Sequence, residues 1–162
     1  MKKFAIVVFA ALLCCSSVCA AEKTYTWKIS TIRPAGTAID NDVKVFIEEV
    51  KTKSNGRINI EIYPNAQLGD YTVVQERISV GSVEMAVQSI STSVDRQLQM
   101  VNLPYLVKDW NGIRKNFRTG SPFMDWLAER LAKQDIKLLG MWPSYFGGIA
   151  LAKEPPSPGD PS

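Results

Sequence analysis

The stretch RINIEIYPNAQLGD, residues 57–70, joins the pattern of a strand to that of a helix start. Ile58, Ile60 and Ile62 alternate with polar residues, as in a strand that is buried on one face. The proline and the glycine that follow end this strand. Asp70 is the expected N-cap of the next helix. The stretch therefore predicts a strand-to-helix corner of the kind that builds α/β proteins.

Strand and helix patterns alternate on both sides of this corner. TYTWKIST (24–31) is rich in β-branched and aromatic residues and predicts a strand, and residues 38–54 repeat apolar positions at helical spacing. A second helix is predicted after the corner, over residues 71–80, and a third strand in VEMAVQSI (83–90). Two successive βαβ units imply a mostly parallel sheet that is flanked by helices.

The second half of the chain continues with shorter and less regular patterns. MVNLPYL (100–106) predicts one short element, and residues 110–117 and 122–134 predict two helices. IKLLGMW (136–142) is a continuous apolar run, which is typical of a strand covered on both faces. YFGGIALA (145–152) predicts a further strand, weakened by its two glycines.

The first residues have the composition of a secretory signal peptide. Lys2 and Lys3 precede an apolar run, and small residues follow up to Ala20 and Ala21. We therefore predict a signal peptide over residues 1–21, cleaved near Ala20-Ala21. An uncleaved anchor is a weaker alternative, because a bilayer span needs about 20 apolar residues. A lipidated cysteine is a slightly stronger alternative than the anchor, although Leu13, Cys14 and Val18 precede the cysteines where a small residue is usual.

The composition of the predicted mature chain excludes several classes of function. All three cysteines, Cys14, Cys15 and Cys19, fall within the predicted signal peptide, and the chain has no histidine. Cysteine and histidine nucleophiles and the usual zinc ligands are therefore absent, and we predict no enzyme and no cofactor. Without Lys2 and Lys3, 17 basic residues face 16 acidic ones. This balance gives no electrostatic footprint for nucleic acid or an anionic membrane.

Candidate binding residues follow from the rule that parallel sheets bind ligands at the carboxyl ends of their strands. There Arg33 offers a planar guanidinium that suits a carboxylate, although a solvated surface arginine is the simpler interpretation. Polar side chains follow the next two predicted strands, and aromatic residues follow the IKLLGM run. The candidates are Arg33, Gln67, Tyr71, Ser89, Trp142 and Phe146.

Four blocks occur in an order that resembles a known family. GRINIEIYPNAQLGD (56–70) is followed by ERISVGSVEMAVQS (76–89), VNLPYL (101–106) and IKLLGMW (136–142). Together they resemble the extracytoplasmic solute-binding proteins of TRAP transporters, the DctP family, over residues 24–152. The resemblance implies a periplasmic protein with two α/β lobes. Such a protein closes on a small organic acid and delivers it to the membrane subunits of a TRAP permease.

The chain departs from the family pattern in two ways. Gly147 stands where family members often carry a carboxylate-binding arginine after the tryptophan, and the family's G-x-K-x-R segment, with a second such arginine, would lie beyond residue 162. We therefore expect residues 22–152 to form a first solute-binding lobe, with the second lobe largely missing. The Pro-rich residues 153–162 would be a crossover or a ragged C-terminus. Two hypotheses remain open: a solute receptor for uptake, and a non-transporting remnant or interaction module.

Overall fold

The computed structural model of the chain describes residues 22–141. The predicted signal peptide and the candidates Trp142 and Phe146 lie outside this range, as do the predicted strand 145–152 and the Pro-rich segment. The elements, in chain order, are β1 (Tyr25–Thr31), α2 (Ala38–Lys53), β2 (Ile58–Tyr63), α3 (Tyr71–Ser79), β3 (Met85–Val87), the 3-10 helix η1 (Arg96–Asn102), α4 (Trp110–Asn116) and α5 (Pro122–Ala132).

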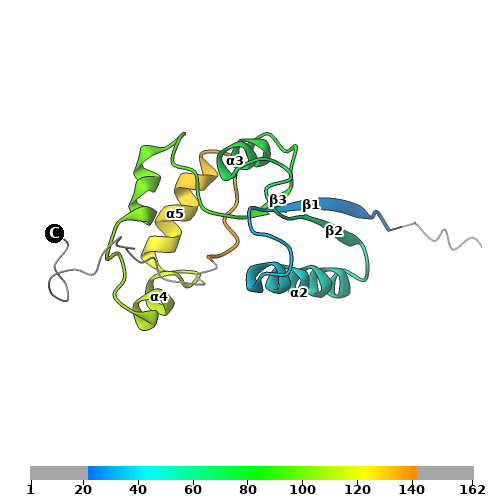
Figure 1. Cartoon of the computed structure of the whole chain (residues 1–162), viewed down its shortest axis with the longest axis horizontal. Helices are drawn as coiled ribbons and strands as arrows, with labels where there is room; N and C mark the ends of the chain where they lie inside the picture. Colours follow the sequence, from blue (N-terminus) through cyan, green and yellow to red (C-terminus); the bar gives the residue numbers. More distant parts are fainter. Residues whose placement is uncertain (1–21, 142–162) are drawn as a thin grey trace, which may run out of the picture.

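Three parallel strands form the sheet, in the order β2-β1-β3. Ile29 at the centre of β1 pairs with Ile62 of β2 on one side and with Met85 of β3 on the other. Figure 1 shows α2 on one face of the sheet and α3 on the opposite face. A mostly parallel α/β sheet flanked by helices, as the alternating patterns predicted, is therefore confirmed.

The core of the sheet part forms where both helices cover β1. Ile29, Val43 of α2 and Val74 of α3 are almost completely buried. Burying one such side chain contributes roughly 1.5–3 kcal/mol. The last three residues of β1 are all buried, whereas its first residues are exposed. The carboxyl end of the central strand is thus the better anchored end.

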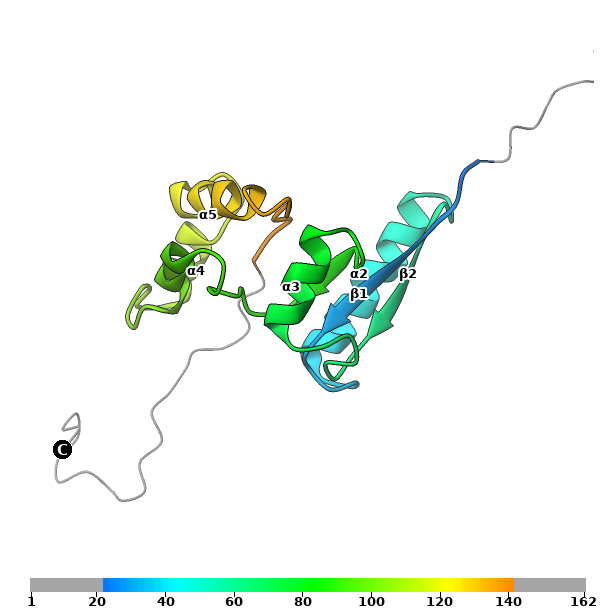
Figure 2. The same cartoon turned by 90° about the horizontal axis from the view of Figure 1, so that it is seen from above.

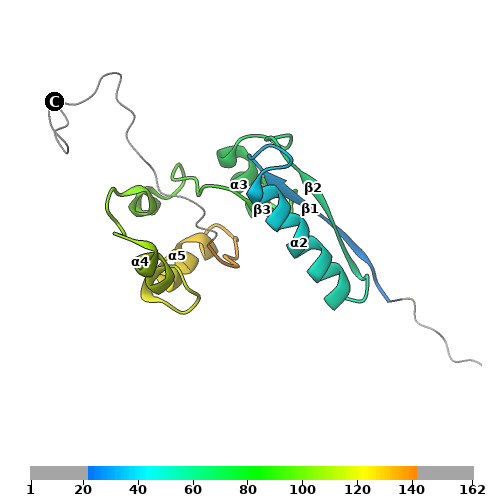
Figure 3. The same ribbon diagram turned by 60° about the horizontal axis from the view of Figure 1, so that its bottom comes forward.

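A second part of the molecule contains η1, α4 and α5, and Figures 2 and 3 show α4 and α5 grouped to one side of the sheet. Leu98, Leu127 and Leu131 form its buried cluster. Phe123 packs edge-on against Phe117, with ring centroids 5.2 Å apart, and stacks on Trp126 at 5.9 Å. These contacts make the side of α5 that carries Phe123, Leu127 and Leu131 its packed face.

The strand predicted over the IKLLGMW run is wrong for its described residues, because residues 136–141 form neither helix nor strand. The N–H of Ile136 donates to the carbonyl oxygen of Leu131 at 3.1 Å. Ile136, Leu138 and Met141 pack against the leucine cluster. Their apolar character therefore serves packing against helices rather than pairing with a strand.

The packed face of α3 combines an apolar and a polar side chain. Val74 is fully buried and Gln75 is only 6% exposed, whereas Val73 is 37% exposed. Val73 lies over Gly69 at the start of the helix. A glutamine takes the second buried position because its carboxamide has hydrogen-bond partners there. Within the described residues, no helix has the length and apolar character needed to cross a membrane.

Candidate ligand-binding site

The loops that leave β1 and β2 are joined at the carboxyl edge of the sheet. The N–H of Asn65 donates to the carbonyl oxygen of Arg33 at 2.8 Å, and the N–H of Ala66 donates to that of Thr31 at 3.1 Å. These two bonds tie the turn after β2 to the last residue of β1 and to the loop that follows it. They hold the loop of Arg33 beside the PNAQLGD turn, as the candidate site requires.

The turn itself has a demanding backbone. Asn65 and Ala66 have φ values of 52° and 54°. This is a left-handed backbone conformation that residues other than glycine rarely adopt. Gly69 has a φ of 104°, and a Cβ at this position would stand 3.0 Å from Cγ1 of Val73. Glycine is therefore required here by both conformation and space. This explains why a glycine directly precedes the helix cap.

Asp70 caps α3 as the sequence predicted. Its Oδ1 accepts hydrogen bonds from the N–H groups of Thr72 at 2.8 Å and Val73 at 3.0 Å. A helix N-terminus normally attracts anions, but here the chain's own carboxylate already occupies these donors. Next to it, Gln67 is exposed and Tyr71 is 41% exposed, so both present neutral polar groups at this edge.

The loop of Arg33 is held by its own backbone and by Asp40. The N–H of Arg33 donates to Oγ1 of Thr31 at 3.2 Å, and the arginine is half-buried. Oδ2 of Asp40 accepts from the N–H of Gly36 at 2.8 Å and from Nζ of Lys44 at 2.7 Å. Asp40, itself fully buried, thus ties the loop after β1 to the first turn of α2.

This arrangement predicts a loss of stability in acid. The hydrogen bond from Lys44 holds the pKa of Asp40 below its ordinary value, and the N–H of Gly36 adds to this effect. When the pKa of a carboxyl group is lower in the folded than in the unfolded state, ionisation stabilises the fold at every pH above the unfolded-state pKa of about 4. This stabilisation is lost as the pH falls through the folded-state pKa. In urea unfolding, Asp40→Asn should therefore be less stable than the native chain at neutral pH, and the difference should shrink in acid.

The exposed pair of Lys53 and Glu49, at 2.8 Å, provides the control for this experiment. Solvent screens such a pair, so Lys53→Met should change the neutral-pH stability much less than Asp40→Asn does. A difference between Asp40→Asn and the native chain that stays constant from neutral to acidic pH would contradict the role given to Asp40.

Beyond β3, the chain is tied back to the start of α3. Nε2 of Gln88 donates to the carbonyl oxygen of Tyr71 at 2.6 Å. Oγ of Ser91 donates to Oγ1 of Thr72 at 3.2 Å. Ser89 lies between these two residues and is exposed. The third strand end is therefore attached to the same edge as the other two.

Four of the six candidate residues can be placed, and they share this edge. Arg33 follows β1, Gln67 and Tyr71 follow β2, and Ser89 follows β3. Their roles toward a ligand remain predictions. Trp142 and Phe146 lie outside the described residues.

Sequence reasoning missed Gln88 and Thr72, which fasten the edge together. Gln88 is the first residue after β3, at the end of the strand. This position at the end of a predicted strand could have marked Gln88 as a candidate site residue. Thr72 carried no comparable signal, because its partner lies 19 residues away.

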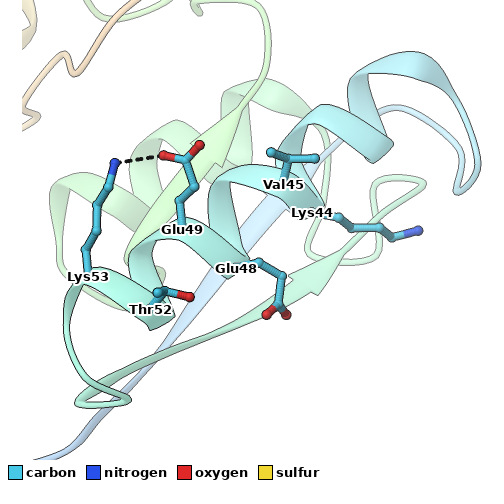
Figure 4. Close-up of a pocket in the computed structure, with 6 residues that line it drawn as sticks. All are labelled: Lys44, Val45, Glu48, Glu49, Thr52 and Lys53. Carbon is cyan, nitrogen blue, oxygen red and sulfur yellow. Dashed lines mark hydrogen bonds and ion pairs between the residues drawn. The ribbon is translucent and has the colours of Figure 1, made fainter.

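A shallow depression lies elsewhere, along the outer side of α2, and all of its described lining residues come from that one helix (Figure 4). Val45 is 61% exposed there, and Lys53 pairs with Glu49. This surface has no second wall among its lining residues and does not include the strand ends. Among residues 22–141, no group of acidic side chains is arranged to hold a metal ion.

Chemically, the carboxyl edge combines the guanidinium of Arg33 with neutral hydrogen-bonding groups, and the carboxylate of Asp70 caps α3 at the same edge. The guanidinium of Arg33 can pair with a carboxylate, while the side chains of Gln67, Tyr71 and Ser89 can bond hydroxyl or carbonyl groups. With cysteine confined to residues 14–19 and no histidine in the chain, the usual activated nucleophiles are not available to this edge. The fold and this edge together define an α/β domain of the ligand-binding type.

The chain belongs to the bacterial extracellular solute-binding protein family 7, DctP, which it matches over residues 29–155. It is 26% identical to the sialic acid-binding periplasmic protein SiaP of Vibrio cholerae, over 82% of this chain. It is also 26% identical to the C4-dicarboxylate-binding periplasmic protein DctP of Rhodobacter capsulatus, over 88% of this chain. The chain spans only 41% and 43% of the lengths of these two relatives.

A solved TRAP periplasmic solute binding protein from Ochrobactrum anthropi has the same fold over the matched part, with a TM-score of 0.62 and 27% identity. The match covers 69% of this chain and 35% of that protein, which is described with its C-terminus bound in the ligand-binding pocket. The family membership implied by the four sequence blocks is therefore confirmed.

Proposed function

We propose that this chain supplies one wall of a periplasmic receptor that captures a small organic acid for uptake through a TRAP-type permease. The observation that carries the proposal is the joining of three strand ends at one edge, where Arg33 lies in the loop after β1 and polar side chains follow β2 and β3. The two named relatives bind sialic acid and C4-dicarboxylates, and both kinds of ligand carry a carboxylate. A carboxylate is also a group that a guanidinium can bind through two parallel hydrogen bonds.

The rest of the family role belongs to the same proposal. Residues 1–21 would direct export and be removed, residues 22–152 would form the first lobe, and residues 153–162 would lead toward a second one. The protein would act by binding rather than by catalysis, and the membrane subunits of the permease would be its protein partners.

One observation favours an alternative, an interaction module without a transport role. Leu103, Tyr105 and Leu139 are 54%, 95% and 66% exposed. Where exposed apolar side chains form a contiguous patch, they often mark a surface that contacts another protein segment. A second lobe of a receptor would cover such side chains equally well, so ligand binding discriminates between the two functions.

Chemical-shift mapping tests the proposed site. We expect succinate at up to about 0.5 M, a concentration suited to the weak hold of a single exposed ion pair, to shift the amides of the loops after the three strands of the ¹⁵N-labelled chain when ionic strength is kept constant. Arg33→Ala should remove most of these shifts because it removes the cation. Glu129→Ala, on the exposed side of α5, should leave them unchanged. Shifts confined to other surfaces, or shifts that survive Arg33→Ala, would argue against a carboxylate site at this edge.

A further inference from the structure

A buried glutamine in α3 makes bonds that no local pattern in the sequence requires. Gln75 is 6% exposed. Its Oε1 accepts the N–H of Ser91 at 2.8 Å, and its Nε2 donates to the carbonyl oxygen of the same residue at 3.3 Å. Nε2 also donates to Oε1 of Gln134, just beyond α5, at 2.9 Å. One carboxamide thus binds three groups from two other segments of the chain.

The pair of bonds to Ser91 resembles the pairing of two strands. A carboxamide carries the same N–H donor and C=O acceptor as a peptide group, so Gln75 offers Ser91 what a neighbouring strand would offer. β3 ends at Val87, and Ser91 lies beyond that end. There the side chain of Gln75 satisfies backbone groups that would otherwise be buried without partners.

The bond to Gln134 links this loop to the other part of the molecule. Ser91 is 2% exposed, and its Oγ also bonds Thr72 of α3. Gln134 follows α5, whose leucines form the second buried cluster. Ile90 of the same loop packs against that leucine cluster. A displacement of α5 would therefore act on the loop after β3 through this apolar contact and through the hydrogen bond between Gln75 and Gln134.

We propose that Gln75 is a positioning residue that fixes the loop of residues 88–91 at the carboxyl edge and couples it to the end of α5. The effect of Gln75 on ligand binding rests on the proposed function. The coupling between the loop and α5 is independent of the proposed function, because it consists of bonds within the chain. The substitution Gln75→Leu removes both donor and acceptor at nearly constant volume, and Glu76→Gln on the exposed side of α3 is the matched control.

Amide hydrogen exchange of the full chain, followed by NMR, provides the test. In Gln75→Leu we expect the N–H of Ser91 to exchange about tenfold faster or more, as loss of one buried hydrogen bond implies. The N–H of Ile29 in β1 should keep its rate, and Glu76→Gln should change neither. Equal acceleration of both amides in Gln75→Leu would indicate general destabilisation and would overturn the proposal. An unprotected Ser91 amide in the native chain would overturn it without any variant.

Gln75→Glu adds a second readout, the pH dependence of the Ser91 amide resonance. A side chain that only filled space would not produce this dependence. Its carboxylate would face two acceptor oxygens, those of Ser91 and Gln134, while protonation would restore one donor. The Ser91 amide resonance should therefore move back toward its native position as the pH is lowered, with a midpoint above the ordinary glutamate value of about 4.3. A resonance that ignores pH would count against the proposal.

A ligand titration separates this inference from the proposed function. With succinate present, Gln75→Leu should reduce the shifts of residues 88–91 and spare those of the loop of Arg33. If the native chain shows no ligand shifts at all, the proposed function fails, while the exchange rates of Ser91 still decide the role of Gln75.

Discussion

Succinate and related organic acids are expected to bind the 162-residue chain at least about a hundredfold more weakly than a longer form that includes a second lobe. Micromolar affinity needs roughly 8 kcal/mol. An exposed ion pair such as that of Arg33 with a hydrated carboxylate contributes only about 0–1 kcal/mol. A second wall would bury the ligand and exclude water from its charged contacts, which strengthens them.

Isothermal calorimetry with a panel of dicarboxylates and sugar acids measures this difference. The longer form can be made by joining residues 22–152 to the remaining part of the Rhodobacter relative, since the chain aligns with 43% of that protein. In the longer form, Arg33→Ala should weaken binding by more than Glu129→Ala does. Micromolar binding by the 162-residue chain would refute the one-wall interpretation, and a longer form indifferent to Arg33→Ala would remove that residue from the site.

Replacing Leu127 by alanine is expected to lower the free energy of unfolding by about 2–5 kcal/mol, the range found when a buried leucine leaves a cavity. Leu127 is fully buried and packs with Leu98 and Leu131 at the centre of the helical part. Small domains have only about 5–15 kcal/mol of stability in total, so this change should remove a large share of it. The loss should also loosen residues 136–141, which pack on the same cluster.

Urea unfolding followed by circular dichroism measures the effect, and Leu139→Ala is the matched control. Leu139 is 66% exposed, so the same chemical change should alter stability by only about 0.5 kcal/mol or less. Similar losses in the two variants would show that the leucine cluster is not the core of the helical part.

The sequence by itself determined the elements of the sheet part, because local periodicity specifies them. Alternating isoleucines marked β2, and the glycine and Asp70 marked the corner and the cap of α3. The order of strands and helices then implied parallel pairing, since a strand-helix-strand unit returns in the same direction. The four sequence blocks identified the family for the same reason: each is a short local pattern.

Only the tertiary structure decided which polar side chains hold the carboxyl edge together. The partners of Gln75 lie 16 and 59 residues away in the sequence, so no local pattern predicts these hydrogen bonds. The same limit explains the error at residues 136–141, where an apolar run packs against helices instead of joining the sheet. An apolar run in the sequence predicts burial but not the partner against which it packs. That partner depends on contacts between segments that are distant along the chain.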